Sequence, residues 1–194
     1  MNTAPCAPHG FAVNCHSILE GGVIVPITWK QIQHPFAPVW DESSRVLVLG
    51  TFPSVQSRAN AFYYGHPQNR FWRVLAMLFG QALPESIDQK LTLLKQHHIA
   101  LWDVLAACDI SGSADATIRN PVANDIPTLL ARTPDMCVFA NGQAAAMLYR
   151  RHIEPVCGVP VHALPSTSPA NAAWTLPRLL QAWQPLLDCV QPDS

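Results

Sequence analysis

The chain has 194 residues, of which 49% are apolar and 13% are charged, and its formal net charge is −1. This composition excludes a disordered chain, and the length suits one domain with a substantial core. The near-neutral charge also excludes a protein that coats DNA electrostatically, so any contact with DNA must come from a small basic patch.

The six cysteines are scattered singly, without the close pairs that are typical of zinc or iron–sulfur sites. We therefore expect no metal and no other cofactor. Cysteines inside apolar runs, such as Cys137, favour buried reduced thiols over disulfides. No apolar run is long enough to span a membrane, and residues 1–34 lack the pattern of a secretion signal. Together these features predict a cytoplasmic protein without a membrane contact.

Residues 1–34 contain one apolar run, at residues 23–27, in a stretch rich in Gly, Pro, His and Cys. An extra edge strand and a loosely attached tail are equally good interpretations of this run. We predict an N-terminal extension of unknown role over residues 1–34 and a single domain over residues 35–194.

Four buried strands are predicted. Residues 46–49 are apolar without interruption and run into Gly50, which is typical of a parallel strand that is buried on both faces. Similar apolar runs predict three more strands, at residues 99–105, 136–140 and 159–164.

Predicted helices alternate with these strands. Apolar residues at helical spacing predict helices at residues 69–80, 84–97, 125–132, 143–151 and 174–190, and residues 106–121 are predicted to be a polar connection. Strands that alternate with helices indicate an α/β protein with three α/β/α layers around a four-stranded parallel sheet.

The carboxyl ends of parallel strands meet at one edge of the sheet, where open α/β sheets bind their ligands. A long loop follows the first predicted strand and contains three adjacent aromatic residues, at 62–64, before His66 and Asn69. Such a loop suits a flat ligand. The residues expected at this edge are Gly50, Thr51, Phe52, Pro53, Asp103, Asn141, Ser166, Thr167 and Ser168.

Three motifs follow one another along the chain: GTFPS at residues 50–54, YYGHPQNRFW at residues 63–72 and LPSTSPAN at residues 164–171. With these motifs, the chain resembles the uracil-DNA glycosylase superfamily, and within it the hypoxanthine-DNA (DNA-deoxyinosine) glycosylase branch, over residues 35–187. The resemblance implies hydrolysis of the N-glycosidic bond of deaminated bases in DNA, chiefly hypoxanthine. Such an enzyme flips the damaged nucleotide out of the duplex and into a pocket.

The resemblance also suggests which residues are catalytic. Phe52 stands where related uracil glycosylases carry an Asp or Asn that positions water, and phenylalanine cannot orient water. The hypoxanthine branch implies that Asn69 takes this role, with its side-chain carbonyl holding water beside an oxocarbenium-like transition state. A helix cap is the alternative role for Asn69, and the two roles are compatible.

Asn141 is the second predicted catalytic residue. Its amide offers both a donor and an acceptor, which would match the lactam edge of hypoxanthine. A turn former in the Asn-Gly pair is the alternative interpretation.

The remaining candidates would bind the substrate. We expect Tyr64 to stack on the flipped base and Asp103 to accept a hydrogen bond from the base, although Asp103 also fits a structural role. His66 suits either the substrate or a bond to the loop backbone. Ser166 replaces a histidine or asparagine common in uracil glycosylases, which leaves little assistance to the leaving group. The predicted base-binding residues are Phe52, Pro53, Tyr64, His66, Asp103 and Ser166, and the predicted DNA contacts are Ser54, Arg58, Arg70, Ser168 and Asn171.

Two other functions remain open from the sequence. One is a mismatch-type uracil-DNA glycosylase. The other is a protein that binds lesions with little catalysis, because Phe52 removes the usual catalytic group. In each case the partner would be DNA that contains deaminated bases, and we expect the protein to be a monomer.

Overall fold

The computed structural model describes residues 16–18, 24–26, 31–111 and 115–190. The chain divides into two compact units, Met1–Lys30 and Gln31–Ser194. In the first unit, β1 (His16–Ile18) pairs antiparallel with β2 (Ile24–Pro26). The predicted apolar run at residues 23–27 coincides with β2, and its two end residues lie outside the described part of the chain.

A four-stranded parallel sheet forms the centre of the second unit, as predicted. Its strands lie in the order β5 (Ile99–Asp103), β4 (Val46–Gly50), β8 (Cys137–Asn141) and β9 (Val161–Leu164). All of β4 is buried. Because side chains of a strand alternate between its faces, Val46 and Val48 pack into one core while Leu47 and Leu49 pack into the other.

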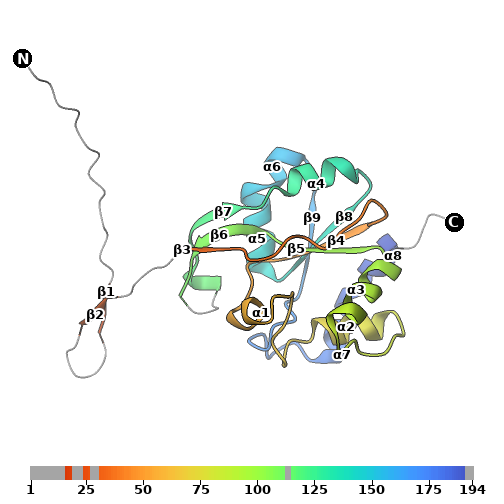
Figure 1. Ribbon diagram of the computed structural model, residues 1–194, viewed down its shortest axis with the longest axis horizontal. Helices are drawn as coiled ribbons and strands as arrows, with labels where there is room; N and C mark the ends of the chain where they lie inside the picture. Colours follow the sequence, from red (N-terminus) through yellow and green to blue (C-terminus); the bar gives the residue numbers. More distant parts are fainter. Residues whose placement is uncertain (1–15, 19–23, 27–30, 112–114, 191–194) are drawn as a thin grey trace, which may run out of the picture. The chain divides into compact units, whose positions relative to one another are not determined.

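Helices cover both faces of this sheet, so the predicted three-layer α/β/α architecture is confirmed (Figure 1). The helices on one face are α2 (Phe71–Leu78), α3 (Ile87–Gln96), α7 (Leu176–Trp183) and α8 (Pro185–Val190). Those on the other face are α4 (Ile126–Arg132), α5 (Gln143–His152) and the short α6 (Glu154–Cys157). A further short helix, α1 (Val55–Ala59), follows β4.

A second, antiparallel sheet was not predicted. It consists of β3 (Gln31–Gln33), β6 (Leu105–Asp109) and β7 (Arg119–Ala123), in that order. The polar connection predicted for residues 106–121 is therefore wrong. β6 follows β5 after Val104 alone, and the 3-10 helix η1 (Asp115–Thr117) precedes β7. Residues of low strand propensity form β6 because strands on both of its sides pair with it.

Residues 31–34 belong to the second unit, so the structure divides the chain four residues before the predicted boundary. β3 pairs with β6 through Gln31, Ile32 and Gln33. The His34 side chain then reaches Asp103 at the end of β5.

Two predicted helices differ in detail. The helix predicted for residues 174–190 is divided into α7 and α8 at Pro185, whose nitrogen carries no hydrogen for a helical bond. The helix predicted for residues 84–97 forms as α3, in which Leu93 and Leu94 are buried, whereas Ile87 and Leu91, at the same apolar spacing, are 44% and 37% exposed.

The cysteine prediction is wrong for one pair. Cys137 of β8 and Cys189 of α8 form a disulfide, whereas Cys108 and Cys157 are free. Apolar neighbours indicate burial in the sequence, but they do not indicate which distant cysteine lies opposite. The disulfide removes one ground for the predicted cytoplasmic location. Cys6 and Cys15 lie outside the described residues.

In the part of the chain that the structure describes, no helix has the length and apolar character needed to cross a membrane. The same residues contain no cluster of three His, Cys, Asp or Glu side chains that could hold a metal ion.

Candidate active site

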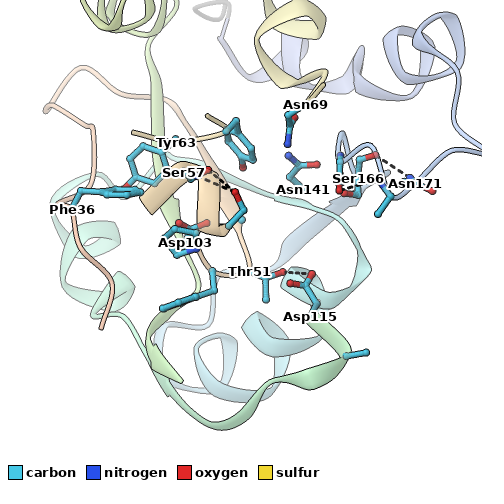
Figure 2. A pocket seen from close by; sticks show the side chains of 18 residues that line it. Phe36, Thr51, Ser57, Tyr63, Asn69, Asp103, Asp115, Asn141, Ser166 and Asn171 are labelled. Carbon is cyan, nitrogen blue, oxygen red and sulfur yellow. Dashed lines mark hydrogen bonds between the residues drawn. The ribbon is translucent and has the colours of Figure 1, made fainter. Parts of the chain in front are cut away.

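A cavity of about 480 Å³ opens at the carboxyl edge of the parallel sheet (Figure 2). The ends of β4, β5 and β8 and the loops after β4 and β9 form its wall. The structure brings most of the predicted site residues together here: Phe52, Pro53, Ser54, Tyr64, Asn69, Asp103, Asn141, Ser166, Ser168 and Asn171. The predicted residues His66, Arg58 and Arg70 do not line it.

Thr167 connects the two predicted catalytic amides. Its side chain is fully buried, and its hydroxyl accepts a hydrogen bond from Asn141 Nδ2 and donates one to Asn69 Oδ1, each at 2.9 Å. The loop after β9, the end of β8 and the start of α2 are thereby joined. The sequence placed Thr167 at the sheet edge, but gave no sign of this role.

The Asn69 carbonyl oxygen is fully engaged. It accepts from the backbone N–H of Phe71 at 3.0 Å and from the hydroxyl of Thr167. The N-cap of α2 is Arg70, so Asn69 is not the helix cap, although its oxygen bonds to the first residue of the helix. Both lone pairs of the carbonyl are used, which makes Nδ2 the better candidate for holding water. The Nδ2 group donates to no described residue, and Asn69 lies at the cavity wall, pointing toward Asn141 (Figure 2).

Asn141 is bonded through both atoms of its amide. Oδ1 accepts from the backbone N–H of Thr167 at 2.9 Å, and Nδ2 donates to the Thr167 hydroxyl. The predicted contact with the lactam of hypoxanthine would have to use the second N–H of Nδ2, since Thr167 occupies the rest of this edge. Gly142 follows with φ of 110°, and a side chain there would meet Ser166 Cβ at 3.1 Å. Both constraints favour glycine at this position.

Arg70 braces the loop at residues 164–171. Its guanidinium donates to the backbone carbonyls of Thr167 at 3.2 Å, Ser168 at 2.6 Å and Asn171 at 3.2 Å, and also to that of Trp174. These bonds use the donors that a phosphate would need. The bonds favour a supporting role for Arg70 in the site over the predicted DNA contact.

The other two residues outside the wall are also bonded to backbone. His66 Nδ1 accepts from the backbone N–H of Gln68 at 3.1 Å, which is the loop-histidine interpretation. Arg58 donates to the carbonyl of Pro53 at 2.6 Å, with its guanidinium 5.9 Å from the Phe52 ring centre. Ser54 caps α1 by accepting from Ser57 N at 3.1 Å.

Asp103 is a buried carboxyl in the cavity wall, and His34 Nε2 lies 2.8 Å from its Oδ2. Burial raises the pKa of Asp103, while the hydrogen bond from His34 lowers it. Oδ1 approaches the main chain of Gly50 so closely that a Cβ there would lie 2.1 Å away. His34 was missed by the sequence prediction because it falls in the predicted extension.

Tyr64 lies beside this carboxyl. Its ring stacks on Phe71 with 3.8 Å between centroids, so only the other ring face is free for a base. The hydroxyl is shielded from solvent and has no partner among the described residues. Burial and the nearby charge of Asp103 raise the pKa of Tyr64, so the hydroxyl stays protonated. It is an unused donor.

Asp115 of η1 provides a second carboxyl at the wall, which the sequence did not reveal as a site residue. It accepts from the Thr51 hydroxyl at 3.0 Å (Figure 2). The cavity thus contains amide and phenol donors together with two carboxyls. It is suited to a polar, flat ligand with both N–H and C=O groups.

The comparisons with known proteins identify the family. A sequence profile described as the Uracil DNA glycosylase superfamily matches residues 37–187, which is most of the chain. The chain belongs to this superfamily. It is 35% identical over 145 residues to a protein named hypoxanthine DNA glycosylase from Methanosarcina acetivorans, covering 72% of this chain and 89% of that one. A protein of the same name from Methanosarcina barkeri is 34% identical over 141 residues, covering 70% and 86%.

A solved structure supports the same assignment. The solution NMR structure of a candidate uracil DNA glycosylase from Methanosarcina acetivorans superposes with a TM-score of 0.67 and 31% identity, covering 79% of this chain and 98% of that one. Membership of the uracil DNA glycosylase superfamily makes the chain a DNA glycosylase by family, with DNA as its substrate. His34 lies outside the residues that the family profile matches.

Proposed function

We propose that this DNA glycosylase is monofunctional and releases hypoxanthine from deoxyinosine in DNA. The observation that carries the proposal is the pair of groups beside Gly50. A Cβ at Gly50 would lie 2.1 Å from Asp103 Oδ1 and 3.4 Å from the Tyr64 hydroxyl, which places an acceptor next to an unused donor. The lactam edge of hypoxanthine presents an N–H beside a C=O and complements this pair.

The reaction in this proposal is a direct hydrolysis. The nucleotide is flipped into the cavity, with the lactam edge of the base toward Asp103 Oδ1 and the Tyr64 hydroxyl. The Asn69 Nδ2 group donates to a water molecule and holds its oxygen toward the sugar. The carboxyls of Asp103 and Asp115 favour the positive oxocarbenium-like transition state electrostatically. Water attacks C1′ as the bond to the base breaks. Its oxygen becomes the hydroxyl of the abasic sugar, and one of its protons passes to the departing base.

Uracil is the second candidate base. It carries the same N–H beside a C=O, and it is smaller than hypoxanthine, so the cavity of about 480 Å³ accommodates either base. We place hypoxanthine first because the two similar archaeal proteins bear that name. The protein would act as a monomer on DNA with deaminated bases, in the cytoplasm.

The experiment uses four duplexes, containing hypoxanthine, uracil, xanthine or no lesion, each incubated with the protein and then treated with alkali. We expect strand scission after alkali at hypoxanthine, with little scission at the undamaged base. Activity should persist in excess chelator. Tight binding to the hypoxanthine duplex without scission would favour a lesion-binding protein instead. Scission at uracil alone would favour the mismatch-type uracil glycosylase.

A further inference from the structure

We propose that His34 is a specificity-determining positioning residue, which keeps Asp103 an acceptor for the ring N–H of a deaminated base. The inference rests on the proposed function and concerns a residue outside residues 37–187. It extends that function by naming the contact through which the cavity would select hypoxanthine over adenine, the normal base from which hypoxanthine forms.

The His34 ring is held firmly in place. Only 4% of its side chain and 6% of that of Asp103 are exposed. Phe36 and Phe52 pack edge-on against the ring, with centroid distances of 4.8 Å and 6.0 Å. Since the ring cannot turn away freely, the 2.8 Å contact of its Nε2 with Asp103 Oδ2 fixes the orientation of the carboxyl.

The neighbours of His34 also define its protonation pattern. The backbone N–H of Phe36 points to Nδ1 at 3.4 Å, so Nδ1 acts as an acceptor. The ring proton then resides on Nε2, which donates to Asp103 Oδ2. This bond leaves Oδ1, the oxygen beside Gly50, as the one that meets a ligand. No described residue donates to Oδ1.

Four titratable groups surround Asp103: His34, Tyr63 and Tyr64 in the segments beside it, and Asp115 in η1. Burial raises the pKa of Asp103, and the hydrogen bond from His34 lowers it. Both tyrosines keep their protons, because burial raises the pKa of each. Of these four groups, His34 is the one whose hydrogen bond lowers the pKa of Asp103 and so favours its ionised form.

The ionisation of Asp103 determines which base edge fits. A carboxylate oxygen only accepts, so it binds the ring N–H of hypoxanthine, xanthine or uracil. Adenine has a lone pair at the corresponding nitrogen. This nitrogen and the carboxylate oxygen would then be two acceptors facing each other, without a hydrogen between them. A protonated Asp103 would instead donate to adenine. Through Asp103, His34 thus favours the deaminated base over the normal one.

The test measures single-turnover release from hypoxanthine and adenine duplexes between pH 5 and 9. His34→Ala should slow hypoxanthine release by at least about tenfold, because a bond to a charged group is lost. Its acidic limb should move to higher pH, since Asp103 then binds a proton more readily. His34→Gln places an amide N–H near the position of Nε2 and should recover the rate to within about threefold. His98→Ala is the matched control, because His98 bonds to Ser43 away from the cavity.

A double-mutant cycle separates positioning from packing. If His34 acts through Asp103, then adding His34→Ala to Asp103→Asn should change the rate by less than about twofold. Additive losses, or a His34→Ala profile with an unchanged acidic limb, would overturn the inference while leaving the proposed function intact. If the parent protein released no base from any lesion duplex, both proposals would fail together.

Discussion

The hydroxyl of Thr167 lies between Asn141 Nδ2 and Asn69 Oδ1, at 2.9 Å from each. Because an amide nitrogen only donates, the hydroxyl proton must point to Asn69. This fixes the orientation of the Asn69 amide, and its nitrogen is left for the cavity. The geometry of the proposed water site therefore depends on Thr167, which is fully buried and does not itself line the cavity.

Thr167→Val should damage both stability and activity. It keeps the shape of the side chain but leaves Asn141 Nδ2 without its partner, which should lower the free energy of unfolding by about 1–3 kcal/mol. Base release should fall by more than about tenfold, because Asn69 loses one of its two anchors. Thr167→Ser keeps the hydroxyl and serves as the control. A stable Thr167→Val variant with the parent rate would show that the connection has no catalytic role.

Asn69→Asp distinguishes the nitrogen of Asn69 from its oxygen. The carboxylate can still accept from Phe71 and Thr167, so the thermal unfolding temperature should change little, whereas the N–H donor is lost. We expect release to fall by about 100-fold or more. Asn69→Ser, whose hydroxyl can still accept from the backbone N–H of Phe71 but which has no amide N–H, should be equally slow. If Asn69→Asp were as fast as the parent, the water contact would belong to the oxygen and the assignment to Nδ2 would be wrong.

Arg70→Ala should weaken the fold without changing the electrostatics of DNA binding. Loss of its bonds to the loop carbonyls should lower the free energy of unfolding by about 2–4 kcal/mol. The slope of log affinity against log salt concentration should stay the same for the folded variant. A phosphate contact would instead reduce that slope by about 0.9. Arg73→Ala, on the exposed side of α2, is the control for stability.

Asp103→Asn should stabilise the protein at neutral pH while it slows base release. Burial raises the pKa of Asp103, so the parent becomes less stable as the pH rises through that pKa. The variant does not lose stability in this way, because its amide stays neutral. The variant should be more stable by about 1 kcal/mol at pH 7. The difference should disappear below about pH 4, where the carboxyl is protonated in both folded and unfolded states. Denaturant unfolding at several pH values measures it. Lower stability of the variant at every pH would mean that the bond from His34 outweighs the cost of burial.

The sequence predicted the parts of the fold that depend on local patterns. The apolar run of β4 and the polar residues after each parallel strand sufficed to place the site at one edge. Pairings between distant residues were not predictable in this way. β3 pairs with β6, His34 reaches a residue 69 positions away, and Cys137 binds Cys189. No local pattern specifies such partners, because each depends on how the whole sheet is assembled.

The atoms that act at the site were also beyond the sequence. The motif identified Asn69, but only the contacts of Phe71 and Thr167 show that its oxygen is occupied. Similarly, Asn141 and Arg70 lie in or beside the expected region, yet their polar groups are bonded within the protein. The type of residue at the end of a strand predicts where a polar side chain lies. Which of its hydrogen-bonding atoms remain free depends on the neighbours that pack against it.

The most direct test is mass spectrometry of a hypoxanthine duplex that has reacted in ¹⁸O-labelled water. We expect free hypoxanthine and an unbroken strand whose abasic sugar carries one ¹⁸O from the water. An unchanged lesion strand, or a strand already cut before alkali, would contradict a monofunctional hydrolytic glycosylase.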